Sequence, residues 1–267
     1  MIAFLTDWSL KSYYVGVAKA VMKRINPSVD IIDITHDIKP FDVRMAAHVL
    51  LRASADFPDG TIFVAVVDYG VGTARKGICM RTKNEQFYVG PDNGIFTYVA
   101  LKYGVKQVRE LDNKSYHYGS SNTFHGRDIF AAVAAHLSNG VAFEKIGSVL
   151  PNYIVLPVKI AQIEGESIVG EVVFCDGFGN VETNIPAAFV KNLGWDIDDT
   201  IVLNDTFQLS YVRAYGDVEK GKALVHVDSS GYLEISINQG SAAEVFNLDE
   251  GAQIKLRRRK IETNRRS

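Results

Sequence analysis

The chain has 267 residues, 47% of them hydrophobic and 22% charged, and its 29 basic residues nearly balance its 31 acidic residues. These values are typical of soluble globular proteins with room for two domains. No apolar run approaches the roughly 18 residues of a membrane-spanning helix, and no basic leader precedes the apolar start, so we expect no membrane partner and a cytoplasmic location.

The first half of the chain alternates segments with strand and helix patterns. The predicted strands are residues 2–6, 29–34, 61–67, 77–81 and 86–89. The predicted helices are residues 15–25, 44–55, 95–103 and 124–137, the last with Thr123 as its N-cap. Apolar strands that alternate with helices favour an α/β domain, residues 1–156, whose mostly parallel sheet is covered on both faces.

The pattern changes after residue 156, where short alternating segments are separated by Gly, Asn and Asp turns. The predicted strands are residues 158–163, 168–174, 200–203, 224–227, 232–237 and 253–256. This pattern is typical of an all-β domain with antiparallel strands, and we predict a barrel over residues 157–260.

Basic charge is concentrated at the C-terminus, where residues 255–267 hold seven basic residues and one acidic residue. The rest of the chain is net acidic, whereas a nucleic-acid binder carries a basic footprint on its folded body, so we predict no nucleic-acid partner. We interpret the arginines from Arg257 onward as a solvated tail, with residues 261–267 outside both domains. An RNA or membrane contact of this tail is the alternative. Cys79 and Cys175 lack metal-type spacing, which favours two buried free thiols.

Polar residues follow three predicted strands of the first domain. They are Asp7, the segment 33–37 and Asp68. Ligands of open α/β sheets bind beyond the carboxyl ends of the strands, and an acidic residue there can accept hydrogen bonds from ribose hydroxyls, which suits Asp7. The alternative is that each Asp only caps a turn or helix.

Two further motifs of the first domain point to chemistry less directly. Gly70 and Gly72 resemble part of a dinucleotide fingerprint, but Arg75 replaces the third glycine and no helix follows, so phosphate binding is weakly indicated. His125 lies at the start of a predicted helix, where the helix dipole favours the neutral imidazole and a hydrogen-bonding or proton-accepting role. A simple capping role is the alternative for His125.

A metal site is a weaker possibility. The candidate ligands are His36, Asp37, His48, His125 and Asp128. They lack the short helical spacing of strong metal motifs, and we predict no metal.

Aromatic and turn residues supply candidates for nucleoside binding. Trp8, Tyr69 and Phe178 stand next to polar motifs and could sandwich a base. In the second domain the polar turns are residues 176–180, 228–232 and 238–243. Each of these turns also has an ordinary explanation as β-turn chemistry.

Taken together, the motifs form an ordered set along nearly the whole chain. They are Thr6-Asp7, Asp33-Ile34-Thr35-His36, Val66-Val67-Asp68, Gly70-Val71-Gly72, Arg75, Gly90-Pro91-Asp92-Asn93-Gly94, Phe124-His125-Gly126-Arg127-Asp128 and the segment 176–180. In the order and spacing of these motifs, the chain resembles the S-adenosylmethionine (SAM) hydroxide adenosyltransferases, relatives of the fluorinase and chlorinase enzymes.

The resemblance implies an N-terminal α/β domain, a C-terminal β-barrel and a homotrimer whose active sites lie between the N-terminal domain of one subunit and the C-terminal domain of its neighbour. Hydrolytic members of the family carry an Asp, Arg and His triad, which corresponds here to Asp68, Arg75 and His125. The fluorinase-like branch lacks this triad and has a halide pocket instead. Retention of the triad favours water over halide as the nucleophile.

The resemblance also implies the residues that bind the substrate. They are Asp7 for the ribose, Asp176 and Ser229 for the methionine amino and carboxylate ends, and Phe178, Asn180 and the segment 238–243, with Asn238 and Ala243, for the adenine side. The chain departs from the family at Trp8-Ser9, where relatives often have Phe-Gly, and at Tyr69, where Pro is usual. These changes bear on the shape of the pocket.

We therefore expect hydrolysis of SAM to adenosine and L-methionine by attack of water or hydroxide at C5′. Asp68 would accept the proton, Arg75 would hold hydroxide-like charge, and His125 would orient either. The sulfonium leaves as a neutral thioether, so we expect no cofactor. The alternatives are a SAM or adenosine sensor without turnover, a halide-using adenosyl transferase and a metal-dependent phosphohydrolase.

Overall fold

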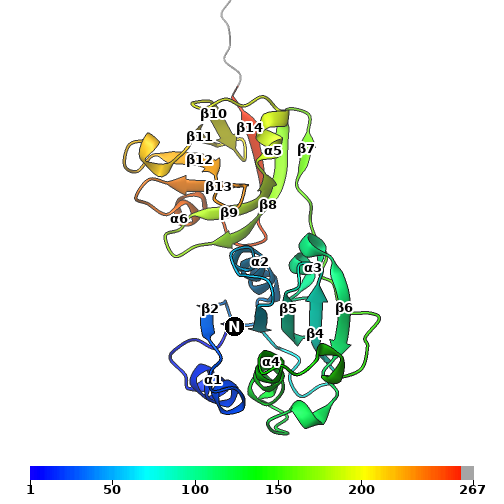
Figure 1. The fold of residues 1–267 in the computed structure, drawn as a ribbon. Coiled ribbons are helices and arrows are strands. Elements are labelled where there is room, and N and C mark those ends of the chain that lie inside the picture. The colour runs from blue at the N-terminus through cyan, green and yellow to red at the C-terminus, as the bar shows by residue number, and fades with distance from the viewer. Residues whose placement is uncertain (260–267) are drawn as a thin grey trace, which may run out of the picture. The chain divides into compact units, whose positions relative to one another are not determined.

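The computed structural model of the protein describes residues 1–259 and divides into two compact units, Met1–Pro157 and the residues from Val158 on (Figure 1). The predicted basic tail, residues 261–267, lies outside the described residues. Within the described part of the chain, no helix combines the length and apolar character needed to cross a membrane. Both cysteines are free thiols: Cys79 is buried as expected, whereas Cys175 is only half-buried.

The first unit is built on a six-stranded sheet in the order β2-β1-β3-β5-β4-β6. The strands are β1 (Ile2–Thr6), β2 (Ile31–Thr35), β3 (Ile62–Val66), β4 (Gly77–Thr82), β5 (Phe87–Pro91) and β6 (Val105–Glu110). The sheet is mixed rather than purely parallel, because β4 runs antiparallel to both β5 and β6. The connection between β4 and β5, residues 83–86, is too short for the crossover that parallel neighbours need.

Helices cover both faces of this sheet (Figure 1). The α-helices are α1 (Tyr14–Ile25), α2 (Val43–Ser54), α3 (Thr97–Tyr103) and α4 (Ala132–Ser138), with short turns η1 (Lys114–Tyr116) and η3 (Phe143–Lys145). Side chains alternate across a strand, so Phe4 of β1 packs with α1 and α4, whereas Leu5 packs with α2 and α3.

The start of the predicted helix 124–137 differs from expectation. Residues Gly126–Ala131 form a π-helix, η2, before α4 begins, and His125 rather than Thr123 occupies the N-cap position without a side-chain cap. Single-turn π-helices are frequent at functional sites. The turn that introduces His125 is therefore wound differently from an ordinary helix start.

The second unit is a barrel. Its strands are β7 (Gln162–Glu164), β8 (Ser167–Cys175), β9 (Val181–Pro186), β10 (Thr200–Leu203), β11 (Phe207–Tyr211), β12 (Ala223–Val227), β13 (Tyr232–Ile237) and β14 (Gln253–Arg258). Pairing of β14 with β8 closes seven strands into a ring, and β7 attaches outside it. Short helices α5 (Ala188–Asn192), η4 (Tyr215–Asp217) and α6 (Ala242–Phe246) connect the strands.

Three expectations for the second half need correction. The barrel is not wholly antiparallel, because β11 and β12 pair in parallel. The predicted strand 158–163 is reduced to the short β7 at its end. Arg257 and Arg258 belong to strand β14 rather than to a tail, and each pairs with an acidic residue while its side chain stays partly exposed. The Arg257 guanidinium lies 2.9 Å from Asp205 Oδ1 and that of Arg258 lies 3.3 Å from Asp199 Oδ2.

Candidate active site

The carboxyl ends of three neighbouring parallel strands meet at one edge of the first sheet, as the sequence predicts. Strand β1 lies between β2 and β3, and Thr6 pairs with Val66, so Asp7 and Asp68 emerge at the same edge. The segment after β2 serves a structural purpose, because buried His36 places its Nδ1 2.9 Å from the Thr6 hydroxyl. This contact joins the ends of β1 and β2 directly behind Asp7.

Asp68, Arg75 and His125 converge in the structure. Arg75 donates from Nε to Asp68 Oδ1 at 3.0 Å and from Nη2 to Asp68 Oδ2, forming a two-pronged pair. The same Nη2 lies 3.2 Å from Nδ1 of His125. The side chains of Arg75 and Asp68 are only 8% and 7% exposed, and the guanidinium lies 5.3 Å from the centre of the Phe130 ring. The arginine therefore links the carboxylate and the imidazole in a largely dry setting.

This arrangement fixes the state of the His125 ring. A guanidinium can only donate hydrogen bonds, so Nδ1 of His125 must accept and the neutral ring carries its proton on Nε2. Burial lowers the pKa of His125, and the charge of Arg75 lowers it further. The neutral form is thus favoured as the sequence predicts, and burial and the Arg75 charge contribute to it.

A cavity of about 630 Å³ opens beside these groups. Of the predicted site residues, those that line it are Asp7, Trp8, Asp68 and His125. Tyr69 does not line this cavity, and its side chain is 66% exposed. Tyr14 and Phe41 also line the cavity and are not predicted from the sequence. Their sequence context carries no motif, so no local signal identifies them.

The Asp7 carboxylate is fixed at the cavity wall by a hydrogen bond. Its Oδ2 accepts a hydrogen bond from the backbone N–H of Phe41 at 3.0 Å. Phe41 adopts a left-handed backbone conformation, with φ of 68°, which is uncommon for a bulky residue and directs this N–H. Burial raises the pKa of the Asp7 carboxyl, while the Phe41 hydrogen bond opposes the rise.

Trp8, one of the departures from the family pattern, is wedged against the residue that follows His125. A Cβ atom on Gly126 would lie 2.4 Å from the Trp8 ring. The indole also meets the Phe124 ring edge-on, with centroids 5.5 Å apart. Only glycine therefore fits at position 126 beside this tryptophan, and Trp8 sets the shape of the cavity next to His125.

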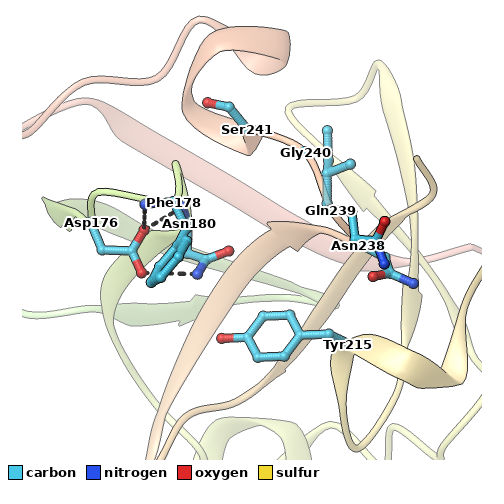
Figure 2. Close-up of a pocket in the computed structure, with 9 residues that line it drawn as sticks. Asp176, Phe178, Asn180, Tyr215, Asn238, Gln239, Gly240 and Ser241 are labelled. Atoms are coloured by element: carbon cyan, nitrogen blue, oxygen red, sulfur yellow. Dashed lines mark hydrogen bonds between the residues drawn. The ribbon is translucent and has the colours of Figure 1, made fainter. Parts of the chain in front are cut away.

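The second unit contains a cavity of about 660 Å³. Of the predicted residues, those that line it are Asp176, Phe178, Asn180 and Asn238 (Figure 2). Ser229 and Ala243 do not line it. The backbone N–H of Ala243 instead donates to the carbonyl of Gly179 at 3.0 Å. Tyr215 lines the same cavity and is not predicted from the sequence.

The Asp176 carboxylate in this cavity organises its own turn. Oδ1 accepts from the backbone N–H groups of Phe178 and Asn180, both at 2.9 Å, and Oδ2 accepts from the Asn180 side-chain amide at 2.9 Å (Figure 2). The turn leaves the Phe178 side chain 83% exposed. Asn238 is likewise held, because its amide donates to the Val218 carbonyl at 2.7 Å.

The possible metal ligands named from the sequence do not gather. Among residues 1–259, no three His, Cys, Asp or Glu side chains are grouped so that they could hold a metal ion. Asp128 accepts instead from the Ser121 backbone N–H at 2.9 Å and from Arg127 Nε at 2.6 Å. It thereby anchors the loop that lines the first cavity.

Comparisons with known proteins cover both units. The chain matches the family model of the SAM hydroxide adenosyltransferase N-terminal domain over residues 2–147 and that of the C-terminal domain over residues 170–255. A Salinispora tropica protein named (R)-S-adenosyl-L-methionine hydrolase is 36% identical, covering 96% of this chain and 97% of its own. One of the same name from Methanocaldococcus jannaschii is 35% identical, with coverages of 96% and 95%.

A fluorinase and two solved structures are also similar to nearly the whole chain. A fluorinase of Actinopolyspora mzabensis is 27% identical over 97% of both chains. The crystal structure of an uncharacterized conserved protein from Thermotoga maritima is 53% identical, with a TM-score of 0.94, and covers 97% of this chain and 100% of its own. A conserved hypothetical protein from Thermus thermophilus is 33% identical, with a TM-score of 0.77 over 97% and 99% of the two chains.

Proposed function

The chain belongs to the SAM hydroxide adenosyltransferase family, and from that premise we propose that it hydrolyses SAM to adenosine and L-methionine. The observation that carries the proposal is the buried cluster of Asp68, Arg75 and His125 beside the cavity that Asp7 lines. Relatives named SAM hydrolase at 35% and 36% identity over nearly the whole chain support the same reaction.

In this reaction a water oxygen attacks C5′ of the ribose while the bond from C5′ to sulfur breaks. The electron pair of that bond returns to sulfur, so methionine leaves as a neutral thioether and needs no proton. The water loses one proton and becomes the 5′-hydroxyl of adenosine. The leaving group thus needs no help, and the protein acts mainly by placing water in line, an effect worth up to about 7–11 kcal/mol.

We assign the proton acceptor to Asp68. Arg75 donates to both Asp68 oxygens. A strong base is not needed for this step, since a water molecule that has bonded to carbon is strongly acidic. Arg75 holds the carboxylate in place and keeps negative charge stable at the nucleophile. His125, with its proton on Nε2, orients the water by donating a hydrogen bond.

Asp7 is assigned to the ribose. One of its oxygens accepts from Phe41, and the other is directed to the vicinal hydroxyls of the sugar. A carboxylate at a strand end is suited to this role in α/β folds. This contact would fix C5′ at a set distance from Asp68 and His125. Binding energy gained at the ribose would then be used to orient the reacting carbon.

The second-unit cavity is assigned to the adenine side, through Phe178, Asn180 and Asn238. We further propose a homotrimer in which this cavity of one subunit completes the first-unit cavity of a neighbouring subunit. Asp176 and Ser229 stay predictions for the methionine ends, and Tyr69 and Ala243 stay predictions for substrate contact. No cofactor takes part in the proposed reaction.

Incubation of the purified protein with SAM, followed by chromatography, tests the function. We expect adenosine and L-methionine in equal amounts, above a heat-killed control. Absence of both products would reject hydrolysis, and SAM binding without products would identify a sensor. Replacement of buffer anions by chloride should leave the products unchanged, whereas 5′-chloro-5′-deoxyadenosine would identify a halide-using transferase.

A further inference from the structure

A carboxylate that the proposed hydrolysis does not use is buried in the barrel next to the second-unit cavity. Glu234 of β13 is 7% exposed. Its Oε1 accepts hydrogen bonds from the Tyr215 hydroxyl at 2.7 Å, the Ser236 hydroxyl at 2.8 Å and Nε2 of His226 at 3.0 Å. A buried carboxylate is costly unless its hydrogen bonds are satisfied. This three-donor arrangement therefore has to be complete for the barrel to tolerate the charge.

The donors keep Glu234 in one protonation state. Burial alone raises the pKa of its carboxyl, but the hydrogen bonds from His226, Tyr215 and Ser236 together hold the pKa below its ordinary value. Burial raises the pKa of Tyr215, and the Glu234 carboxylate raises it further. The carboxylate stays charged and the phenol keeps its proton, so the contact between them persists across the ordinary pH range.

Tyr215 is the member of this network that reaches the cavity. Its side chain lines the cavity, whereas Glu234, His226 and Ser236 do not. The residue is 40% exposed and belongs to the short turn η4. Its hydroxyl is fixed by Glu234, and its ring meets the His226 ring edge-on with centroids 4.8 Å apart. Two contacts thus immobilise a side chain that stands opposite the Asp176–Asn180 turn (Figure 2).

We propose that Glu234 is a positioning residue for nucleoside binding: through the Tyr215 hydroxyl it holds the Tyr215 ring as a fixed wall against which the planar base stacks. This inference rests on the proposed function, which places adenine in this cavity. An aromatic ring that is already ordered loses little conformational freedom when a ligand binds, so its stacking energy is retained as affinity.

The test uses the full-length protein with adenosine as the probe and calorimetry as the measurement. Glu234→Ala frees the Tyr215 ring and should raise the adenosine Kd about tenfold, in the range of one stacking contact. Tyr215→Ala should raise it at least as much. Glu234→Gln keeps an oxygen that can accept the Tyr215 hydrogen bond, so the Kd should stay within about twofold of the wild type. With SAM, KM should follow the Kd while kcat is unchanged.

Glu171 provides the matched control. It is 3% exposed, belongs to the same barrel, and pairs with Lys159 at 2.9 Å, but it does not line the cavity. Glu171→Ala should lower the melting temperature and leave the adenosine Kd unchanged. An unchanged Kd in Glu234→Ala, or an equal rise in Glu171→Ala, would overturn the inference. If the wild type binds adenosine but forms none from SAM, hydrolysis fails and the Kd comparison still decides the role of Glu234.

Discussion

The two cavities have similar volumes, about 630 Å³ in the first unit and about 660 Å³ in the second, but they use their polar groups differently. In the first, Arg75 joins a carboxylate seven residues away to an imidazole fifty residues away. In the second, the Asp176 carboxylate is engaged by groups of its own turn. The proposal therefore places the chemistry in the first cavity and recognition of the base, by shape and an exposed aromatic face, in the second.

This difference predicts that substitutions in the first cavity change turnover, whereas substitutions in the second change affinity. The largest expected effect is that of Asp68→Asn, which preserves shape and removes the proton acceptor. We expect kcat to fall by about 10²- to 10⁴-fold, with the adenosine Kd within about twofold of the wild type. Asp112→Asn, an exposed site in the same unit, is the control. A loss of less than about fivefold in kcat would remove Asp68 from the role of base.

Gly126→Ala tests whether the shape of the first cavity depends on Trp8. The new methyl group would lie 2.4 Å from the indole, and such overpacking costs about 1–3 kcal/mol in unfolding free energy. Combination with Trp8→Phe should recover part of this loss, because the smaller ring leaves room. Urea unfolding of the two single variants and the double variant measures the coupling. Strictly additive effects would show that the two residues do not oppose each other.

Phe178→Ala should change substrate affinity, the role proposed for the second cavity, without changing turnover, the role proposed for the first. The side chain is 83% exposed, so its removal should leave the melting temperature unchanged. Loss of one stacking surface should raise KM and the adenosine Kd about tenfold, with kcat intact. Steady-state kinetics and calorimetry measure both. A fall in kcat with unchanged KM would contradict the division of roles between the two cavities.

The smallest expected effect concerns the protonation of His125. Burial and the charge of Arg75 both lower the pKa of His125. The ring therefore stays neutral down to a lower pH than an ordinary histidine does. Turnover should hold as pH falls through about 6.5, the ordinary pKa of histidine, and decline only below it. Arg75→Gln removes the positive charge and should move the His125 pKa upward in an NMR titration. A downward or absent shift would exclude this coupling.

The sequence predicts features that depend on local pattern, and it misses those that depend on distant contacts. Asp7 and Asp68 are found because each directly follows an apolar strand, and parallel strands share an edge. The neutrality of His125 is predicted from its place in the helix, but the contribution of Arg75 is not, since nothing local shows that Arg75 touches the ring. Tyr215 is missed because the partner of its hydroxyl, Glu234, lies nineteen residues further along the chain on β13.

Charge patterns mislead for the same reason. Arg257 and Arg258 look like part of a tail because their partners, Asp205 and Asp199, lie more than fifty residues earlier in the chain. The antiparallel direction of β4 is also not visible in its own residues, because its apolar pattern fits either orientation. Only the short connection to β5 sets the direction of the strand.

Hydrolysis of SAM in water enriched in oxygen-18 tests the central claim most directly, namely that water attacks C5′. Mass spectrometry of the products should find the heavy isotope in the 5′-hydroxyl of adenosine and none in methionine. Adenosine without the isotope, or label in the amino-acid product, would contradict the account.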